Sequence, residues 1–388
     1  MFQYYLIACI PAILGGILCY FNKNINWKEW LIGSGCAFLL AGIINLMPVS
    51  SMTDDIEYLS GNVISAYYQP EWIETYEEAI YDHWTTYETV GYGKHRHTVS
   101  YSHSRFSHYE TRFRTHYASS QLSASYGFGV IENYNIGIAD FENIASQFKD
   151  RSATPQAYTG FYSGDRNIYS TVNRAGVTIP TITKHAWVNK VRAAPSKFSF
   201  HKVDETVPVY NYPDFSNHFM SERILGDAAG KFSIRKFDEM CSRLGTTKKC
   251  NIIIVGFNKA DQNLAMQQRD KWFGGKKNDI VICYGYAPLE GNVSNVVWAK
   301  CFGWFTNEEM GKNLEKLFME NPLDDNLLSL IEKEVAANYV KRDWKAMDLL
   351  EVQPTSGWYW ALIVSMLVTQ IGLYLFFNYK ANIDFGRV

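Results

Sequence analysis

Several motifs that commonly identify an enzyme or a metal site are missing from this chain of 388 residues. It contains no Gly-x-Ser-x-Gly turn for an activated serine, no His-Glu-x-x-His helix for catalytic zinc and no Cys-x-x-Cys pair. The formal net charge is only −2, whereas recognition of nucleic-acid phosphates requires concentrated positive charge. No nucleic-acid partner is therefore expected, and the sequence gives no reason to name a catalytic nucleophile.

Charge is also absent from three apolar stretches, each close to the ~20 residues that a helix needs to cross the hydrocarbon core. They are residues 2–21, 30–49 and 358–379. The first stretch could instead be a secretory signal, but no Lys or Arg precedes its apolar region. We therefore predict three transmembrane helices, two in a hairpin over residues 1–51 and one in a C-terminal segment over residues 354–388.

The placement of basic residues predicts the orientation of these helices. Lys23 and Lys28 lie in the connection between the first two stretches, and Lys380 and Arg387 lie in the C-terminal tail. Short loops that carry Lys and Arg face the cytoplasm. Residues 52–355 are then expected on the opposite side of the inner (cell) membrane. The lipid bilayer is the first partner that the sequence predicts.

The sequence between the membrane segments is long enough for two domains of ordinary size. Residues 52–209 are rich in Tyr, Thr, Ser, Val and Trp in short alternating runs, which predicts a β-rich domain. In residues 210–353, unbroken apolar strands alternate with helices, which predicts a mostly parallel sheet covered on both faces. The strands expected there are residues 251–257, 280–284 and 296–301, and the helices are residues 232–244, 263–272, 308–319 and 327–343. The predicted fold class is an α+β membrane protein.

A hairpin is predicted in the β-rich domain, with strands over residues 84–90 and 97–103 and glycines in its turn. Histidine is concentrated there. On a strand, His95, His97 and His103 would project from one face, where they could bind zinc or copper. Their spacing fits no known ligand motif, so a solvated hairpin face is the alternative. The same residues could form a surface that responds to pH, since histidine changes charge between about pH 5 and 8.

The run Trp272-Phe273-Gly274-Gly275-Lys276-Lys277-Asn278-Asp279 directly precedes an apolar strand. It has the pattern of a helix-to-strand turn, with glycines for left-handed backbone geometry and lysines that suit a helix C-terminus. A Walker phosphate loop is excluded, because Asp270 stands where its first Gly should be and no Ser or Thr follows Lys276. The run could be a turn without chemistry. Alternatively it is a binding turn, in which Asp279 and Asp227 converge at loop ends of the sheet and hold Ca²⁺ or Mg²⁺.

These residues carry a resemblance to known proteins. The order of Leu225-Gly226-Asp227-Ala228-Ala229 opening a helix, the strand 251–255 and the glycine-lysine run resembles the TPM domain, a membrane-associated α/β fold of bacterial and thylakoid proteins. More closely, the chain is similar to uncharacterised membrane proteins encoded by tailed phages and some bacteria. In these a β-rich segment precedes a Trp-x-Gly-Gly-Lys-Lys-Asn-Asp motif and a strand with Trp, here Val297-Trp298-Ala299. The similarity covers about residues 58–317. TPM proteins have been linked to phosphatase activity, metal binding and membrane-protein maintenance.

Two cysteines of the second domain allow alternative predictions. Cys283 and Cys301 lie in segments expected to be strands on the oxidising side of the membrane. A disulfide between them is plausible if the two strands are neighbours. Buried free thiols, which pack as small apolar side chains, are the other interpretation.

Three functions from different classes fit these observations. The first is a non-enzymatic, membrane-anchored protein that binds an envelope partner through the aromatic side chains of its β-rich domain. In a phage setting it would modify the host membrane or exclude other phages. The second is a metal-dependent phosphohydrolase of TPM type, with Asp227 and Asp279 holding the ion. The third is a structural subunit of a homo-oligomeric envelope assembly. Convergence of Asp227, Asp261 and Asp279 in a cleft would favour the enzyme.

Overall fold

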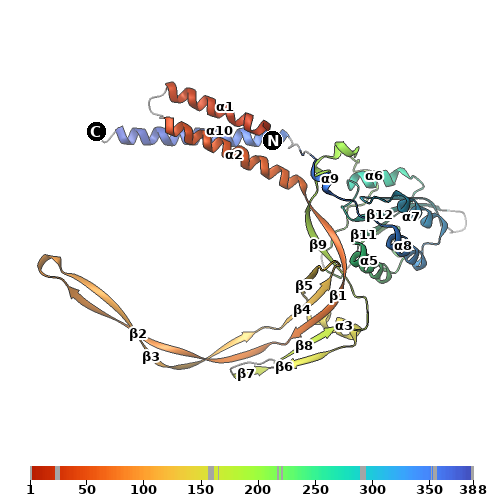
Figure 1. The fold of residues 1–388 in the computed structure, drawn as a ribbon, viewed down its shortest axis with the longest axis horizontal. Helices are drawn as coiled ribbons and strands as arrows, with labels where there is room; N and C mark the ends of the chain where they lie inside the picture. The colour runs from red at the N-terminus through yellow and green to blue at the C-terminus, as the bar shows by residue number, and fades with distance from the viewer. Residues whose placement is uncertain are drawn as a thin grey trace.

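The computed structural model describes residues 2–21, 27–155, 161–164, 166–215, 218–219, 222–288, 294–350, 352 and 356–385. These residues form three parts, arranged as an open C in Figure 1. A helical bundle lies at one end, a body that contains two sheets lies in the middle, and a long two-stranded arm extends from the other end. The bundle and the arm point in the same general direction away from the body (Figure 1).

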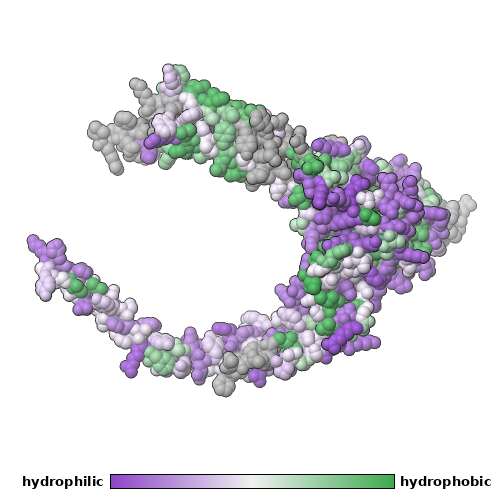
Figure 2. Space-filling view, viewed as in Figure 1, coloured by the Kyte–Doolittle hydropathy of each residue, from purple (hydrophilic) through white to green (hydrophobic). Residues whose placement is uncertain are grey.

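The bundle consists of α1 (Phe2–Phe21), α2 (Trp27–Thr53) and α10 (Ser356–Phe385). A small buried core joins the three helices, formed by Ala8, Ala41, Leu362 and Met366. Two polar side chains bond across the bundle: Trp30 Nε1 donates to the Ala12 carbonyl at 2.8 Å, and Gln370 Nε2 donates to the Gly33 carbonyl at 2.7 Å. Many large apolar side chains of the bundle are exposed, and Figure 2 shows the resulting apolar surface.

The prediction of three transmembrane helices is wrong for the part of the chain that the structure describes. One stretch there, Gly357–Phe377 in α10, is long and apolar enough to cross a membrane. The described apolar stretch of α1, Ala8–Ile17, covers about half of the ~20 residues that a crossing needs. Helix α2 has Lys28 and Glu29 in its first turn and continues into the body. The α+β class is confirmed, with one candidate membrane span.

Strand β1 (Asp54–Gln69) is the central strand of the body and begins at the residue after α2 ends. In a six-stranded antiparallel sheet, β1 pairs with β9 along its first half and with β4 and β8 along its second half. The other strands of this sheet are β4 (Ser119–Ser125), β5 (Ile131–Asn135), β6 (Ser152–Pro155), β8 (Asn167–Val172) and β9 (Pro180–Val188). Helix α3 (Ile138–Phe148), which the strand-only prediction overlooked, buries Phe141 and Ile144 in the core of this sheet.

The arm is an antiparallel hairpin of β2 (Trp72–Val90) and β3 (His97–His116), paired without a break except for one bulge between Ile80 and Tyr81. The predicted hairpin is confirmed, with positive φ at Gly91 and Gly93 in its turn. Its strands are more than twice as long as predicted, because the pairing continues down to the body. At its base, β7 (Phe161–Gly164) pairs with the first four residues of β2.

The second sheet of the body has the order β10-β11-β12-β13, with parallel pairing of the first three strands and antiparallel pairing of the last. Its strands are β10 (Ile224–Gly226), β11 (Asn251–Phe257), β12 (Asp279–Pro288) and β13 (Ser294–Gly303). Its helices are α5 (Ile234–Lys248), α6 (Asn263–Lys271), α7 (Glu308–Glu320) and α8 (Asp325–Asn338). Separate apolar cores cover its two faces, which confirms the predicted mostly parallel, doubly covered sheet. Short helices α4 (Lys190–Ala193) and α9 (Lys345–Asp348) lie where the body meets the bundle.

Two local predictions for this sheet are settled by its register. The run that begins at Leu225 ends β10 and forms a turn, and α5 begins only after its Ser233 cap, so this run does not open a helix. Cys283 is paired with Lys300 and Cys301 with Ile282, so the two thiols belong to neighbouring positions on opposite faces. Both thiols are free, and Cys283 is buried as that interpretation predicted, whereas Cys301 is only partly buried.

The two halves of the body meet where α5 crosses β1. Ser242 Oγ donates to the Gly61 carbonyl at 2.6 Å, and a Cβ on Gly245 would lie 2.2 Å from the Ser60 carbonyl oxygen. The turn after β4 approaches the end of the same helix, because a Cβ on Gly127 would lie 1.9 Å from the Thr246 carbonyl oxygen. Glycine at these positions therefore permits the close packing of the two halves.

Gly127 and Gly129 provide a matched test of this contact. Both have a φ of 79°, but an added Cβ meets nothing within 4 Å at Gly129. We expect Gly129→Ala to lower the free energy of unfolding by about 1 kcal/mol, from backbone strain alone. Gly127→Ala should cost at least ~2 kcal/mol more, because the Thr246 carbonyl must also move. Unfolding of the purified protein, followed by tryptophan fluorescence, measures both. Equal losses would show that the close approach does not stabilise the body.

Candidate functional site

The glycine-lysine run forms the turn that its sequence predicts. Trp272 follows α6 with its indole buried and its Nε1 donating to the Tyr210 carbonyl at 3.0 Å. Gly274 and Gly275 have φ values of 81° and 85°, and Phe273 shares this left-handed geometry at 51°. The backbone N–H of Lys276 donates to Asp279 Oδ2 at 2.6 Å, which closes the turn. The predicted helix-to-strand geometry is confirmed.

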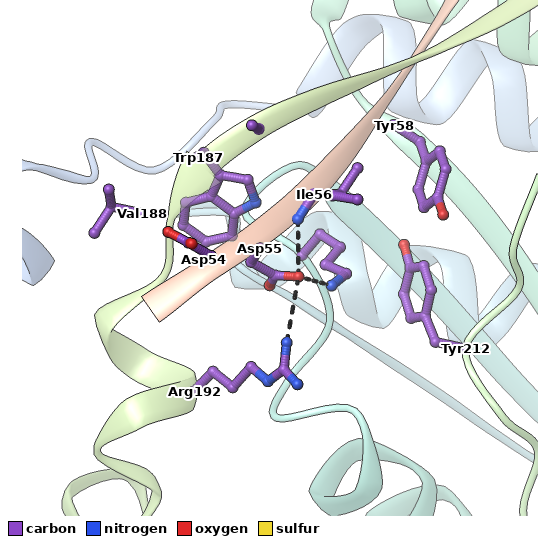
Figure 3. Close-up of a pocket in the computed structure, with 10 residues that line it drawn as sticks. Asp54, Asp55, Ile56, Tyr58, Trp187, Val188, Arg192 and Tyr212 are labelled. Atoms are coloured by element: carbon purple, nitrogen blue, oxygen red, sulfur yellow. Dashed lines mark hydrogen bonds and ion pairs between the residues drawn. The ribbon is translucent and has the colours of Figure 1, made fainter. Parts of the chain in front are cut away.

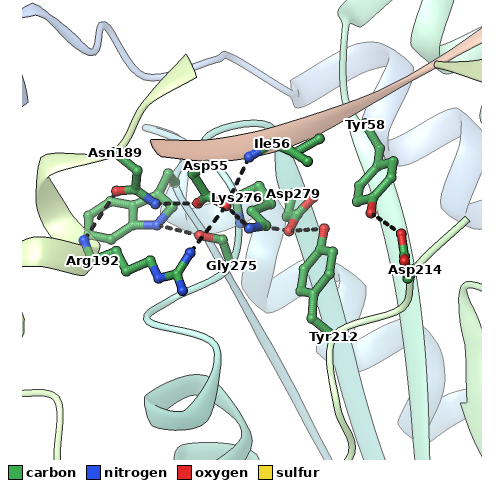
Figure 4. A network of polar contacts seen from close by, with 11 residues as sticks. Asp55, Ile56, Tyr58, Asn189, Arg192, Tyr212, Asp214, Gly275, Lys276 and Asp279 are labelled. Carbon is green, nitrogen blue, oxygen red and sulfur yellow. Dashed lines mark hydrogen bonds and ion pairs between the residues drawn. The ribbon is translucent and has the colours of Figure 1, made fainter. Parts of the chain in front are cut away.

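The last four residues of the run make their side-chain contacts with other parts of the body. Lys276 pairs with Asp55 of β1, and Lys277 Nζ lies 2.9 Å from Glu57 Oε1. Asn278 Nδ2 donates to the Tyr58 carbonyl at 2.7 Å. Successive residues of the turn therefore contact Asp55, Glu57 and Tyr58 in order along one strand. We call the contacts of residues 276–278 with residues 55–58 the clasp, and Figure 4 shows the pair of Lys276 and Asp55 within it.

The Asp55 carboxylate is buried and has several partners besides Lys276. Asn189 Nδ2 donates to its Oδ2 at 2.7 Å, and the backbone N–H of Ile56 donates to its Oδ1 at 2.9 Å. Arg192 Nη1 lies 3.9 Å from Oδ1. The exposed fraction of the whole Asp55 residue is 7%. A charge removed from water to this extent requires such compensation, and Figure 4 shows the partners converging on it.

Asp279 has a structural role at the start of β12. Its carboxylate accepts hydrogen bonds from Asn251 Nδ2 at 2.9 Å and from the Tyr212 hydroxyl at 2.8 Å, in addition to the bond from Lys276 N–H. Burial raises the pKa of Asp279, and these donors oppose that rise. When an acid whose pKa is raised by folding ionises, the free energy of unfolding falls. The three donors reduce this loss because they stabilise the ionised carboxylate. Both carboxylate oxygens are already used by the protein.

The predicted convergence of Asp227 and Asp279 is wrong. Asp227 follows β10, whose Gly226 is level with Gly256 and Tyr284 across the sheet, whereas Asp279 begins β12 opposite Asn251. Five residues of strand separate the two levels, about 17 Å. Asp227 follows the end of its strand, whereas Asp279 stands at the start of its strand. In a parallel sheet these two positions lie at opposite edges of the sheet. Among the described residues no three His, Cys, Asp or Glu side chains are grouped to hold a metal ion.

The three histidines of the arm are not brought together either. His97 and His103 lie on one face of β3, but six residues of strand separate them by about 20 Å. His95 is in the short 3₁₀ turn Gly93–His95 rather than on a strand. His103 stacks on Trp84 with ring centroids 5.4 Å apart. The predicted zinc or copper site is therefore not formed in this arrangement.

A cavity of about 570 Å³ adjoins the clasp, next to the junction of α2 and β1. Figure 3 shows its aromatic wall of Tyr58, Trp187 and Tyr212, with Asp54, Asp55 and Arg192 beside it. Asp55, Lys276 and Arg192 face one another rather than the cavity alone. The cavity offers ring surfaces and paired charges, and holds no arrangement of an activated nucleophile and a base.

Sequence reasoning overlooked the residues on the other side of the clasp. The sequence-based prediction gave no role to Asp55 and Glu57, whereas their alternation within β1 places both on one buried face. A second buried contact was also missed: Arg223, which is 3% exposed, donates to Ser60 Oγ at 2.5 Å and to Asp238 Oδ1 at 3.0 Å. For the clasp, the signal available in the sequence was the pair of acidic residues at alternate positions, Asp55 and Glu57.

Comparison of the chain with known proteins finds no matching family model, no matching curated protein and no matching solved structure. The TPM and phage-protein resemblances therefore stay predictions. The site itself has to indicate what this protein does, and its geometry is that of a contact that holds two halves of a body together.

The clasp predicts a large difference between buried and exposed lysines. Lys276→Met should lower the free energy of unfolding by about 3 kcal/mol, because it leaves the buried Asp55 charge without its main partner. Lys316 is the matched control: it pairs with Glu320 at the surface, with exposed fractions of 68% and 61%. Lys316→Met should cost less than ~1 kcal/mol. Urea unfolding of the purified protein measures both changes. A loss for Lys276→Met as small as the control would contradict a role in holding the body together.

Proposed function

We propose that this protein is a membrane-anchored envelope protein whose arm binds a partner. The arm is the observation that supports this proposal. It extends two strands of about 20 residues into solvent (Figure 1), and most of its side chains are exposed. Beyond the four residues of β2 that pair with β7, the outer edges of both strands have no strand partner among the described residues.

The composition of the arm favours a binding role over a passive one. Soluble proteins commonly protect a free sheet edge with charged side chains, lysine above all, or with proline, a β-bulge or a cover. The arm has acidic and arginine side chains and one bulge. Between residues 72 and 116 there is no proline, and Lys94 in the turn is the only lysine. Large side chains stand exposed along it, among them Tyr87 at 74% and Phe113 at 72%. Exposed aromatic side chains on a rigid element are typical of contact surfaces.

The anchor in this proposal is α10, and the body and arm lie outside the cytoplasm. Lys380 follows the apolar stretch of α10 and favours a cytoplasmic C-terminal end. Of the other basic residues that predicted this orientation, Lys28 is at the start of α2, whereas Lys23 and Arg387 lie outside the described residues. The resemblance to phage proteins would give such a protein a role in modifying the host membrane or in excluding other phages.

Shortening the arm tests the binding role. Ala79 and Tyr109 are cross-strand partners, so residues 80–108 can be replaced by an Asn-Gly turn without disturbing the rest of the pairing. The full-length protein, captured through a C-terminal tag from solubilised native membranes, should retain a partner that the shortened protein loses. The two proteins should unfold at similar temperatures, because the removed residues pair only with each other. Identical sets of captured proteins would contradict the proposal.

Labelling of introduced cysteines tests the location. Tyr92 at the tip of the arm is 94% exposed. Tyr92→Cys should react with a membrane-impermeant maleimide in intact spheroplasts, and Lys380→Cys should react only after lysis. The wild type is labelled in parallel as the background, because Cys301 in the body is only partly buried, whereas Cys241, Cys250 and Cys283 are buried. Reaction of Tyr92→Cys only after lysis would place the arm in the cytoplasm.

A further inference from the structure

The register of the arm divides its side chains into two faces of different chemistry. Directly opposite residues of an antiparallel pair project from the same face. One face carries even-numbered residues of β2 together with their partners in β3, and the other carries odd-numbered residues with theirs. The bulge beside Tyr81 lets the alternation continue with Phe106 opposite Tyr81. We call the face with the even-numbered residues of β2 the charged face and the face with the odd-numbered residues the neutral face.

Several charges of the charged face are paired within the arm. Arg112 Nε donates to Glu78 Oε2 at 2.9 Å, and His116 Nε2 lies 2.8 Å from Glu74 Oε2. Arg114 lies over the ring of Tyr76, 5.0 Å from its centroid. The residues that carry charge or histidine on this face also include Asp82, Glu88, His97, His103, Arg105, His108 and Glu110. A partner would have to desolvate these groups, which makes this face a poor surface for tight packing.

The neutral face presents aromatic rings and hydroxyl groups to solvent. Its large side chains include Tyr81, Phe106 and Tyr109, with Phe106 and Tyr109 ring centroids 5.0 Å apart and Tyr81 and Phe106 centroids 6.0 Å apart. They are 50%, 44% and 62% exposed. Between them stand small residues, Thr75, Thr85, Thr89, Thr98, Ser100, Ser102, Ser104, Thr111 and Thr115. Only Glu77 and His83 carry an ionisable acid or base on this face.

Beyond Ile73 at its base, this face packs against no other element in the part of the single chain that the structure describes. A lone two-stranded ribbon is only marginally stable in water. The small number of charges on the neutral face indicates which kind of surface covers it. Two identical surfaces can pack together without repulsion only when they carry few like charges, and this surface meets that condition along its whole length. The area is also suitable. A ribbon about 65 Å long and 10 Å wide covers about 650 Å² on each copy, or about 1,300 Å² in total, within the size of stable interfaces.

We propose that the neutral face of the arm packs against the neutral face of the arm in a second copy of this chain. This inference rests on the proposed binding role of the arm and names the partner. Face-to-face stacking at about 10 Å buries the rings of Tyr81, Phe106 and Tyr109 and leaves the charged faces in water. The two-fold arrangement uses the same surface on both copies, as in most homodimers.

Neighbouring residues provide the test. A photoreactive benzophenone amino acid is placed at Tyr87 on the neutral face or at Glu88 on the charged face, in full-length protein that is expressed with two different tags. Irradiation of native membranes should join the two tagged copies from position 87, at least ten times more than from position 88. Equal cross-linking from both positions would indicate edge-to-edge pairing and overturn the face assignment. No cross-linked dimer from position 87 would overturn self-association.

A second measurement does not depend on photochemistry. The double variant Tyr109→Lys and Phe113→Lys should convert a dimer in detergent, as measured by light scattering, to a monomer. Glu88→Lys, on the charged face, should leave it dimeric. A monomeric wild type, or a dimer that survives the double variant, would contradict the inference. A cross-link from position 87 to a different protein would overturn self-association while supporting the binding role of the arm, so the two proposals can fail separately.

Discussion

The arrangement of the whole molecule depends on the buried polar contact between β1 and the second sheet. Asp55, Glu57, Tyr58, Ser60 and Gly61 of one strand meet Lys276, Lys277, Asn278, Arg223 and Ser242. Ion pairs removed from water add little net stability, but removing one partner is costly. Such contacts therefore favour a single alignment: a slip of β1 by one residue would reverse its faces and leave each charge unpaired.

The same strand transmits this alignment in two directions. Helix α2 ends at Thr53 and β1 begins at the next residue, without a linker. The Asn189 N–H donates to the Thr53 carbonyl at 2.6 Å and the Asn189 side chain donates to Asp55, so the junction is bonded on both sides. The other end of β1 leads into β2 after only two residues. The bundle, the clasp and the base of the arm are thus consecutive parts of one nearly continuous chain segment.

What the sequence predicted well depended on local patterns. The apolar run of β11 matches its predicted bounds, and the Gly-Gly turn before β12 has the predicted left-handed geometry. The predicted convergence of Asp279 with Asp227 failed because Asp279 stands at the start of a strand and Asp227 follows the end of one, and these positions lie at opposite edges of a parallel sheet. Contacts such as Lys276 with Asp55 join residues 221 positions apart, and only the pairing of two domains reveals them. The count of membrane helices failed because length and apolarity alone do not show how far α2 continues into the body.

The shape in Figure 1 constrains how an anchored protein can present its arm. The arm points in the same general direction as the bundle, and its charged face carries Glu, Asp and Arg, which are excluded from hydrocarbon. A bilayer around α10 therefore leaves the arm in water only if the angle between bundle and arm changes. The junction of α2 and β1 is held by Asn189, whereas β7 holds the arm through only four residues of β2. An anchor in α10 therefore requires a change of angle at the junction of α2 and β1 or at the base of the arm, and the clasp, which lies between these two places, keeps its contacts in both cases.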